Sequence, residues 1–203
     1  GAEHSDKSRM KEAMASFPSQ IEGEVSYCGL NSGKSFGANS FFIEHPDGNW
    51  LIDSPRYLKH LVEAFERKGG IAYIFLTHKD DVADAERYAA HFGAKRMIHR
   101  ADVGAAPGAE WIIEGIESLQ VMPQFQVIPV PGHTAGSMAL LYKSRFLFTG
   151  DHLWWDSAQK RLGAPTQLVW RRHVLMDSIK KLLDYPFEWV LAGHGDRTCL
   201  SAD

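Results

Sequence analysis

Hydrophobic positions in the first half of the chain follow two spacings, one typical of strands and the other typical of helices. Residues 41–45 and 50–53 are strand-like and flank the turn signal Pro46-Asp47-Gly48-Asn49, so they predict a hairpin. Farther along, helical spacing that ends at glycine predicts two helices, and short apolar runs predict two strands. The predicted helices are residues 57–68 and 82–92, and the predicted strands are residues 71–76 and 96–99.

The second half of the chain again places strands before a helix. It contains a second predicted hairpin, in which residues 139–142 and 145–148 are joined by Lys143-Ser144. The other predicted elements are strands at residues 111–113, 125–130 and 189–191 and a helix at residues 168–183. Because this order occurs twice, we predict an α/β fold with two sheets packed face to face and helices outside. We expect residues 1–20 to be a loosely ordered lead-in and residues 21–203 to form a single domain.

Composition narrows the class of protein. Of the 203 residues, 44% are hydrophobic and 23% are charged, which are ordinary values for a globular domain. The net charge of −3 indicates no basic surface for nucleic acid, and no apolar run approaches the roughly 20 residues of a membrane span. Residues 1–20 lack the hydrophobic core of a secretory signal. Cys28 and Cys199 are too few for an iron–sulfur cluster, and we expect reduced thiols in a cytoplasmic protein.

Four short segments follow predicted strands and carry the candidate chemistry. They are Leu-Thr-His-Lys-Asp-Asp at residues 76–81, Pro-Gly-His-Thr-Ala-Gly-Ser at 131–137, Phe-Thr-Gly-Asp at 148–151 and Ala-Gly-His-Gly at 192–195. Each places a histidine or an aspartate at the end of a strand. Strand ends at one edge of a sheet can converge, and imidazole with carboxylate is the ligand set that binds zinc, iron or manganese. The sequence therefore predicts a metal site.

In the first of these segments, His78 and Asp80 stand two residues apart. In extended backbone, side chains at this spacing project to the same side, so both can reach one ion. His99 and Asp102 lie at another predicted strand end near the same edge, and one of them is a candidate to support a ligand from outside. His152 follows Asp151 directly, and we expect it to point away from the site.

Taken in order, the segments around His133, Asp151 and His194 resemble the motifs of the metallo-beta-lactamase fold superfamily, from about residue 21 to residue 195. The resemblance implies a four-layer αββα sandwich of two mixed sheets with a one- or two-metal site, most often zinc, at the sandwich edge. It also implies hydrolysis of a small molecule by metal-activated water. The implied metal ligands are His78, Asp80, His133, Asp151 and His194.

The first segment departs from the family pattern Thr-His-x-His-x-Asp-His, because Asp80 stands where the second histidine belongs. Without a gap, Val82 and Ala83 take the places of the final Asp-His pair. With a two-residue insertion, Asp84 takes the aspartate position and Ala85 the last histidine. We favour the insertion, because Thr-His-x-Asp-Asp-Val-x-Asp looks like a variant pattern of one subgroup of the superfamily. One histidine ligand is missing on either alignment.

The departure predicts an altered and mononuclear site. The first metal position would be formed by His78, Asp80 and His133 with Asp151 beside them. The extra carboxylate moves the metal preference of this position toward iron or manganese. The flavodiiron branch of the superfamily also carries a carboxylate at that second position. The second metal position would be formed by Asp84, Asp151 and His194. It would bind metal weakly or stay empty because one imidazole is missing, and Asp84 is a candidate general base. The alternative for Asp80 is a helix N-cap, and for Asp84 an acid in the first turn of a helix.

Three functions remain open on this evidence. The favoured one is metal-dependent hydrolysis of a small ester, thioester, amide or phosphoester. The second is an iron-binding redox protein with a separate electron donor, and the third is a non-catalytic module with a degenerate metal site. We expect neither a secreted β-lactamase, because no export signal is recognisable, nor a thioesterase of the glyoxalase II type or a nuclease, because only a short tail follows His194.

Overall fold

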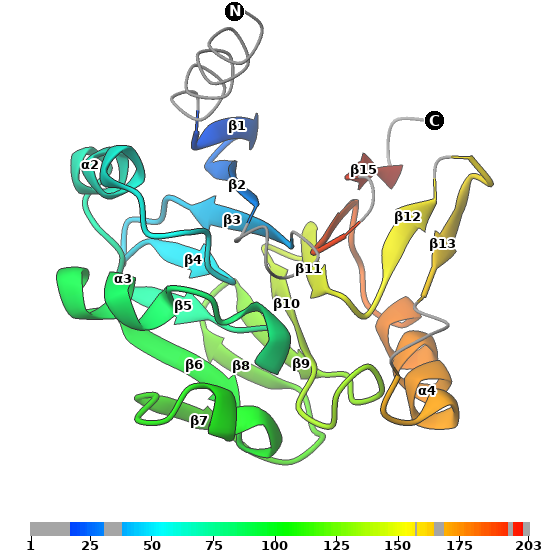
Figure 1. Cartoon of the computed structure of the whole chain (residues 1–203). Coiled ribbons are helices and arrows are strands. Elements are labelled where there is room, and N and C mark those ends of the chain that lie inside the picture. The colour runs from blue at the N-terminus through cyan, green and yellow to red at the C-terminus, as the bar shows by residue number, and fades with distance from the viewer. Residues whose placement is uncertain (1–16, 31–37, 157, 165–168, 195–196, 201–203) are drawn as a thin grey trace, which may run out of the picture.

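Two β-sheets packed face to face form the centre of the molecule (Figure 1). The computed structural model describes residues 17–30, 38–156, 158–164, 169–194 and 197–200. The first sheet runs in chain order, antiparallel from β1 to β4 and parallel from β4 to β7. Its strands are β1 (Ser19–Glu22), β2 (Val25–Leu30), β3 (Asn39–Ile43), β4 (Trp50–Ile52), β5 (Tyr73–Phe75), β6 (Lys95–His99) and β7 (Trp111–Ile113).

The second sheet has the order β15-β14-β11-β10-β9-β8, and β11 and β14 pair in parallel. Its strands are β8 (Leu119–Met122), β9 (Phe125–Pro129), β10 (Met138–Tyr142), β11 (Phe146–Gly150), β14 (Trp189–Ala192) and β15 (Thr198–Cys199). Three residues, Lys143 to Arg145, join β10 to β11, and Lys143 and Ser144 have φ of 54° and 51°, as in the tight turns that match the right-handed twist of a hairpin. A separate hairpin pairs β12 (Trp154–Asp156) with β13 (Arg161–Gly163).

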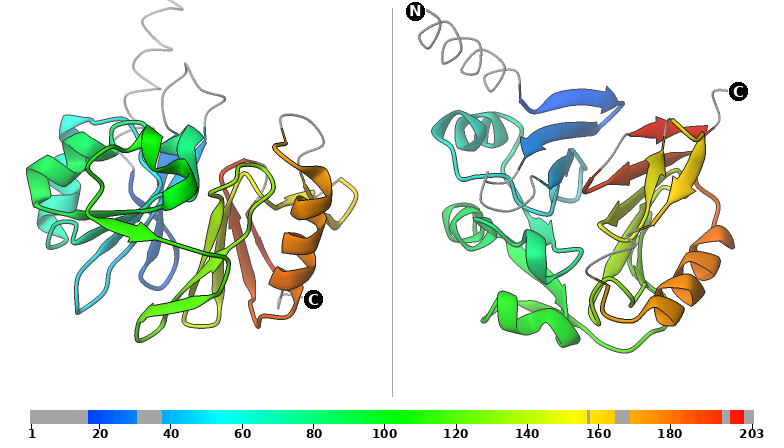
Figure 2. Two further views of the ribbon diagram at one scale, coloured as in Figure 1. Left: turned by 90° about the horizontal axis from the view of Figure 1, so that it is seen from below. Right: turned by 45° about the vertical axis from the view of Figure 1, so that its right-hand side comes forward.

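Helices cover the outer faces of both sheets. Figure 2 shows α2 (Lys59–Arg67) and α3 (Ala85–Phe92) outside the first sheet and α4 (Arg172–Leu183) outside the second. Two short 3₁₀ helices, η1 (Lys79–Asp81) and η2 (Arg100–Ala105), follow β5 and β6. The predicted αββα arrangement with two mixed sheets is therefore confirmed.

Three apolar clusters lie between the four layers. Along β10, Leu140 faces the cluster between the sheets, whereas its neighbour Leu141 faces the cluster that contains Leu182 of α4. Between the sheets, the Trp50 ring from β4 stacks on the Phe125 ring from β9 with centroids 4.2 Å apart. This two-sided burial explains why the strands read as continuous apolar runs.

Both predicted hairpins and the other predicted strands form within a few residues of their expected bounds. The predicted helix at 82–92 begins only at Ala85, because a 3₁₀ turn occupies residues 79–81. The helix predicted at 168–183 begins at Arg172, and residue 168 lies outside the described residues. Residues 1–16 of the predicted lead-in also lie outside them, whereas Ser19 already belongs to β1. None of the helices that the structure describes is long and apolar enough to cross a membrane.

Candidate metal centre

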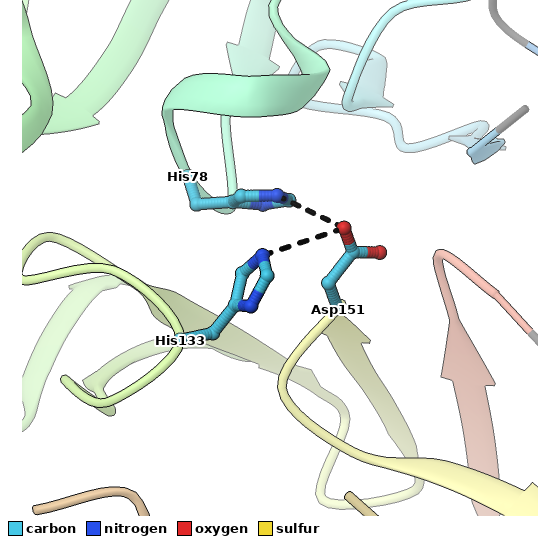
Figure 3. A group of neighbouring side chains, drawn as sticks. All are labelled: His78, His133 and Asp151. Carbon is cyan, nitrogen blue, oxygen red and sulfur yellow. Dashed lines mark ion pairs between the residues drawn. The ribbon is translucent and has the colours of Figure 1, made fainter. Parts of the chain in front are cut away.

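Three predicted ligands from three different segments converge at one edge of the sandwich (Figure 3). His78 follows β5, His133 lies in the loop between β9 and β10, and Asp151 follows β11. Oδ2 of Asp151 lies 3.2 Å from Nε2 of His78 and 3.6 Å from Nε2 of His133. The structure thus brings together two imidazoles and a carboxylate, which we call the first group.

A second group shares the same aspartate. Asp81, Asp151 and His194 each offer a ligand atom, and these atoms lie within 4.8 Å of one another. Nε2 of His194 lies 3.0 Å from Oδ1 of Asp151, the oxygen that does not face the first group. Asp151 therefore stands between the two groups with one oxygen toward each, as a bridging carboxylate would.

Asp80 lies beside the first group on its open side. Its Oδ2 is 3.6 Å from Nε2 of His133 and 3.9 Å from Nε2 of His78, and its side chain is 56% exposed. The structure therefore brings the predicted ligands His78, Asp80, His133, Asp151 and His194 together.

Asp84 does not join them. Its Oδ2 accepts a hydrogen bond of 2.7 Å from the backbone N–H of Tyr57, and Asp81 occupies the place predicted for it. The physical reason is the 3₁₀ turn η1, in which side chains three residues apart eclipse one another. The turn directs Asp81 toward His78, with 3.4 Å between Asp81 Oδ2 and His78 Nε2. In the sequence, the signal for Asp81 is its spacing of three residues from His78. This spacing places Asp81 at the site only if β5 ends before His78 and a 3₁₀ turn follows.

Ala85, the expected place of the missing histidine, also faces away from both groups. It is 2% exposed and packs with Leu61 and Tyr88 in the cluster between the first sheet and helices α2 and α3. A histidine at this position would therefore lie in the core. The alignment with a two-residue insertion predicts Asp84 and Ala85 at the site, whereas the structure places neither of them among the ligand atoms.

We predict that Ala85→His destabilises the protein by about 1–3 kcal/mol without adding a metal ligand, because an imidazole would overpack this apolar cluster. Ala90→His is the matched control on the same helix, since Ala90 is exposed. Urea denaturation of the two metal-free variants measures the difference. A gain in metal affinity with Ala85→His would contradict this placement.

A buried chain of polar contacts fixes the orientation of His78. Oδ1 of Asp53 accepts the backbone N–H of Thr77 at 2.8 Å, and the Thr77 hydroxyl lies 2.9 Å from Oδ2 of Asp53 and 2.9 Å from Nδ1 of His78. If the hydroxyl donates its one proton to Asp53, it accepts the N–H of Nδ1, which leaves Nε2 of His78 free to bind a metal. Gly150 allows the end of β11 to lie against the Thr77 hydroxyl, because an added Cβ would collide with Thr77 Oγ1. Its φ of +56° also favours glycine.

The charges of the groups are strongly coupled. Burial lowers the pKa of His78, but the carboxylates of Asp151 and Asp81 outweigh it and raise the pKa to about 9. Burial raises the pKa of Asp151, yet His194 and His78 bring it well below its usual range. Burial and the charge of His78 lower the pKa of His133. In the metal-free centre these shifts favour a protonated His78 beside an ionised Asp151.

The donor set fits a divalent metal ion. Nε2 of His78 and both ring nitrogens of His133 are buried and make no hydrogen bond with the described residues. Buried polar atoms without partners are costly, and a metal ion would satisfy those that face Asp151. His152 is also buried without hydrogen bonds from its ring, and burial lowers its pKa to about 3. It belongs to neither group of ligand atoms.

Comparison with known proteins finds one family model over most of the chain. A family model described as the metallo-beta-lactamase superfamily matches residues 23–197. A hydroxyacylglutathione hydrolase from Cereibacter sphaeroides is 29% identical over 164 residues, which are 77% of this chain and 62% of that protein. One from Chelativorans sp. is 28% identical over 150 residues, which are 71% of this chain and 56% of that protein. The chain thus spans only about 60% of the length of these curated relatives.

Solved structures share the fold. TTHA1623 in a di-iron-bound form is similar with a TM-score of 0.67 and 24% identity, covering 85% of this chain and 94% of that one. The B3 metallo-beta-lactamase BLEG-1 is similar with a TM-score of 0.69 and 21% identity, covering 87% of this chain and 94% of that one. These likenesses confirm the sandwich and its two mixed sheets.

Proposed function

The chain belongs to the metallo-beta-lactamase superfamily, and we propose that it is a metal-dependent hydrolase of small thioesters or esters. The observation that carries the proposal is the convergence of His78, His133 and Asp151, with the Nε2 atoms of both imidazoles buried and making no hydrogen bond with the described residues. In a module that binds no metal, burying these polar atoms would cost free energy with no ion to offset it.

The residues have distinct roles in this proposal. A divalent ion would supply Lewis acidity, which polarises a carbonyl and lowers the pKa of water toward ~7. His78, His133 and Asp151 would hold the first ion, and Asp80 would add a carboxylate from the open side. Asp81 and His194 would hold a second ion together with Asp151. With one imidazole instead of two, this second group is the weaker binder.

The donor set also bears on the choice of metal. Three carboxylates and three imidazoles surround the two positions, and carboxylate ligands favour iron or manganese more than a set of histidines does. We therefore propose zinc, iron(II) and manganese(II) as the ions to load. An iron-binding redox role remains the second candidate, and the observation that favours it is the carboxylate of Asp80 near both imidazoles.

The substrate class is proposed from the named relatives. They are hydroxyacylglutathione hydrolases, so an acyl thioester of glutathione is the first substrate to test. This proposal replaces the expectation, drawn from the short segment after His194, that the protein is no thioesterase of the glyoxalase II type. The experiment compares this thioester with an aryl ester and a phosphodiester on protein loaded with each of the three ions. Turnover of the thioester or the ester supports the proposal. Metal-loaded protein that hydrolyses none of the three, but exchanges electrons as an iron protein, supports the redox role instead.

Metal affinity should increase with pH. The pKa of His78 is raised to about 9 in the metal-free protein, so below that pH its imidazole must lose a proton before it can bind an ion. We predict that zinc affinity for the first group rises about tenfold per pH unit from pH 6 to pH 8 and levels off above about pH 9. Competition with a chelating dye of known proton affinity measures it. Affinity independent of pH over this range would contradict the proposed ligand role of His78.

A further inference from the structure

Asp102, which lies outside both groups of ligand atoms, contacts the two segments that carry the histidines of the first group. It is buried in η2, after β6. Its Oδ2 accepts the backbone N–H of Lys79 at 2.9 Å and the hydroxyl of Thr134 at 2.6 Å. Its Oδ1 accepts the backbone N–H of Gly136 at 3.0 Å. One carboxylate therefore connects the residue after His78 with the residues after His133.

The fit around Asp102 is close. An added Cβ on Gly136 would lie 2.5 Å from Cγ of Asp102, so only glycine allows the His133 loop to approach this carboxylate. The Thr134 hydroxyl also lies 2.9 Å from Oγ of Ser137, whose own hydroxyl accepts the backbone N–H of Thr134. The loop that carries His133 thus contacts Asp102 through Thr134 and Gly136. A hydrogen bond between Thr134 and Ser137 closes the loop on itself.

We propose that Asp102 is a positioning residue that sets the distance between His78 and His133 and thereby the affinity of the first group for metal. The proposal rests on the proposed function, because it assumes that these two histidines bind an ion together. Lys79 belongs to η1, whereas Thr134 and Gly136 lie in the irregular loop between β9 and β10. The backbone N–H of Met138 already donates to the carbonyl of Thr77 at 2.7 Å, and Asp102 adds a second connection through Lys79, on the other side of His78 in the sequence. Because Asp102 accepts hydrogen bonds from both segments, movement of one segment relative to the other breaks at least one of them.

Asparagine at this position keeps the shape but cannot keep the three hydrogen bonds. Its amide has one oxygen, so in either orientation the NH₂ group faces the backbone N–H of Lys79 or that of Gly136. We predict that Asp102→Asn weakens zinc binding to the first group about 10- to 100-fold, the range for residues that support a ligand from outside. Thr134→Val removes one of the three bonds and should have a smaller effect.

The matched control is Glu110→Gln. Glu110 also accepts a backbone N–H, that of Arg96 in β6, and pairs with the Arg96 guanidinium, but none of its hydrogen bonds reaches a ligand loop. Zinc competition and the cobalt(II) absorption spectrum are measured for the parent and for the Asp102, Thr134 and Glu110 variants, with melting temperatures of the metal-free forms. If Asp102 acts by positioning, Asp102→Asn alters the spectrum and affinity, whereas Glu110→Gln lowers the melting temperature alone.

A double variant tests whether Asp102 and Thr134 act through the same contact. Asp102→Asn with Thr134→Val should weaken zinc binding by less than the product of the two single losses, because both act on one contact. Parent-like affinity and spectrum in Asp102→Asn would overturn the positioning role while leaving the metal site intact. Equal losses in Asp102→Asn and Glu110→Gln at equal melting temperature would also overturn it. A parent that binds no zinc would overturn the proposed function, and this inference with it.

Discussion

Asp151→Asn is expected to remove bound metal from both groups and to lower hydrolysis by at least about 10³-fold, more than the 10- to 100-fold typical of residues outside the ligand set. Asp151 is the one described residue common to both groups, and its two oxygens face opposite sides. An amide offers a single neutral oxygen, so it cannot serve both positions. In the metal-free protein the change also leaves two imidazoles without their carboxylate partner.

The control for this variant is Asp156→Asn in the β12–β13 hairpin. Asp156 accepts the backbone N–H groups of Ala158 and Gln159, and it belongs to neither group of ligand atoms. Metal content by mass spectrometry and turnover of the thioester are measured for both variants after identical loading. Asp151→Asn protein that keeps its metal and its turnover would refute the bridging role.

Asp81→Asn is expected to weaken binding of the second metal equivalent at least about 100-fold, whereas Asp84→Asn should leave it within the range of the parent. Asp81 offers a carboxylate oxygen within 4.8 Å of the ligand atoms of Asp151 and His194. Asp84 instead binds the backbone of Tyr57, a contact that an asparagine oxygen can replace. The two variants change the same chemical group three residues apart, so each is the control of the other.

Titration with cobalt(II) distinguishes the two positions, because the second equivalent should bind more weakly and produce its own absorption change. Loss of the second equivalent in Asp84→Asn, with Asp81→Asn like the parent, would restore the alignment with the insertion and contradict the structure. In that case the 3₁₀ turn of η1 would have to unwind when metal binds.

Much of the site was predictable from the sequence because strand ends fix where a side chain goes. His133 and Asp151 each follow an apolar strand and carry glycine nearby, and their sheet positions follow from the chain order of the hairpin β10–β11. His194 follows β14, which pairs in parallel with β11, so the histidine comes to the same edge as Asp151. The apolar strands and their order along the chain are therefore enough to predict the place of His133, Asp151 and His194 at one edge of the sandwich.

The segment after β5 was less predictable because its backbone changes from strand to 3₁₀ turn within one residue. His78 still has extended backbone, with φ of −169° and ψ of 178°, whereas residues 79–81 are a 3₁₀ turn. Extended spacing favours Asp80 as the partner of His78, but the turn adds Asp81 and removes Asp84. The role of Ala85 depends on α3 packing against the first sheet, a contact between distant segments that local spacing does not encode.

Metal loading followed by a hydrolysis assay tests whether the protein is a metal-dependent hydrolase. The protein is stripped with chelator, loaded stepwise with zinc, iron(II) or manganese(II), and assayed with the glutathione thioester and an aryl ester at each step. We predict that turnover is absent without metal and rises in proportion to the first equivalent bound. Protein that binds none of the three ions, or turnover that is the same in the stripped and the loaded protein, would contradict it.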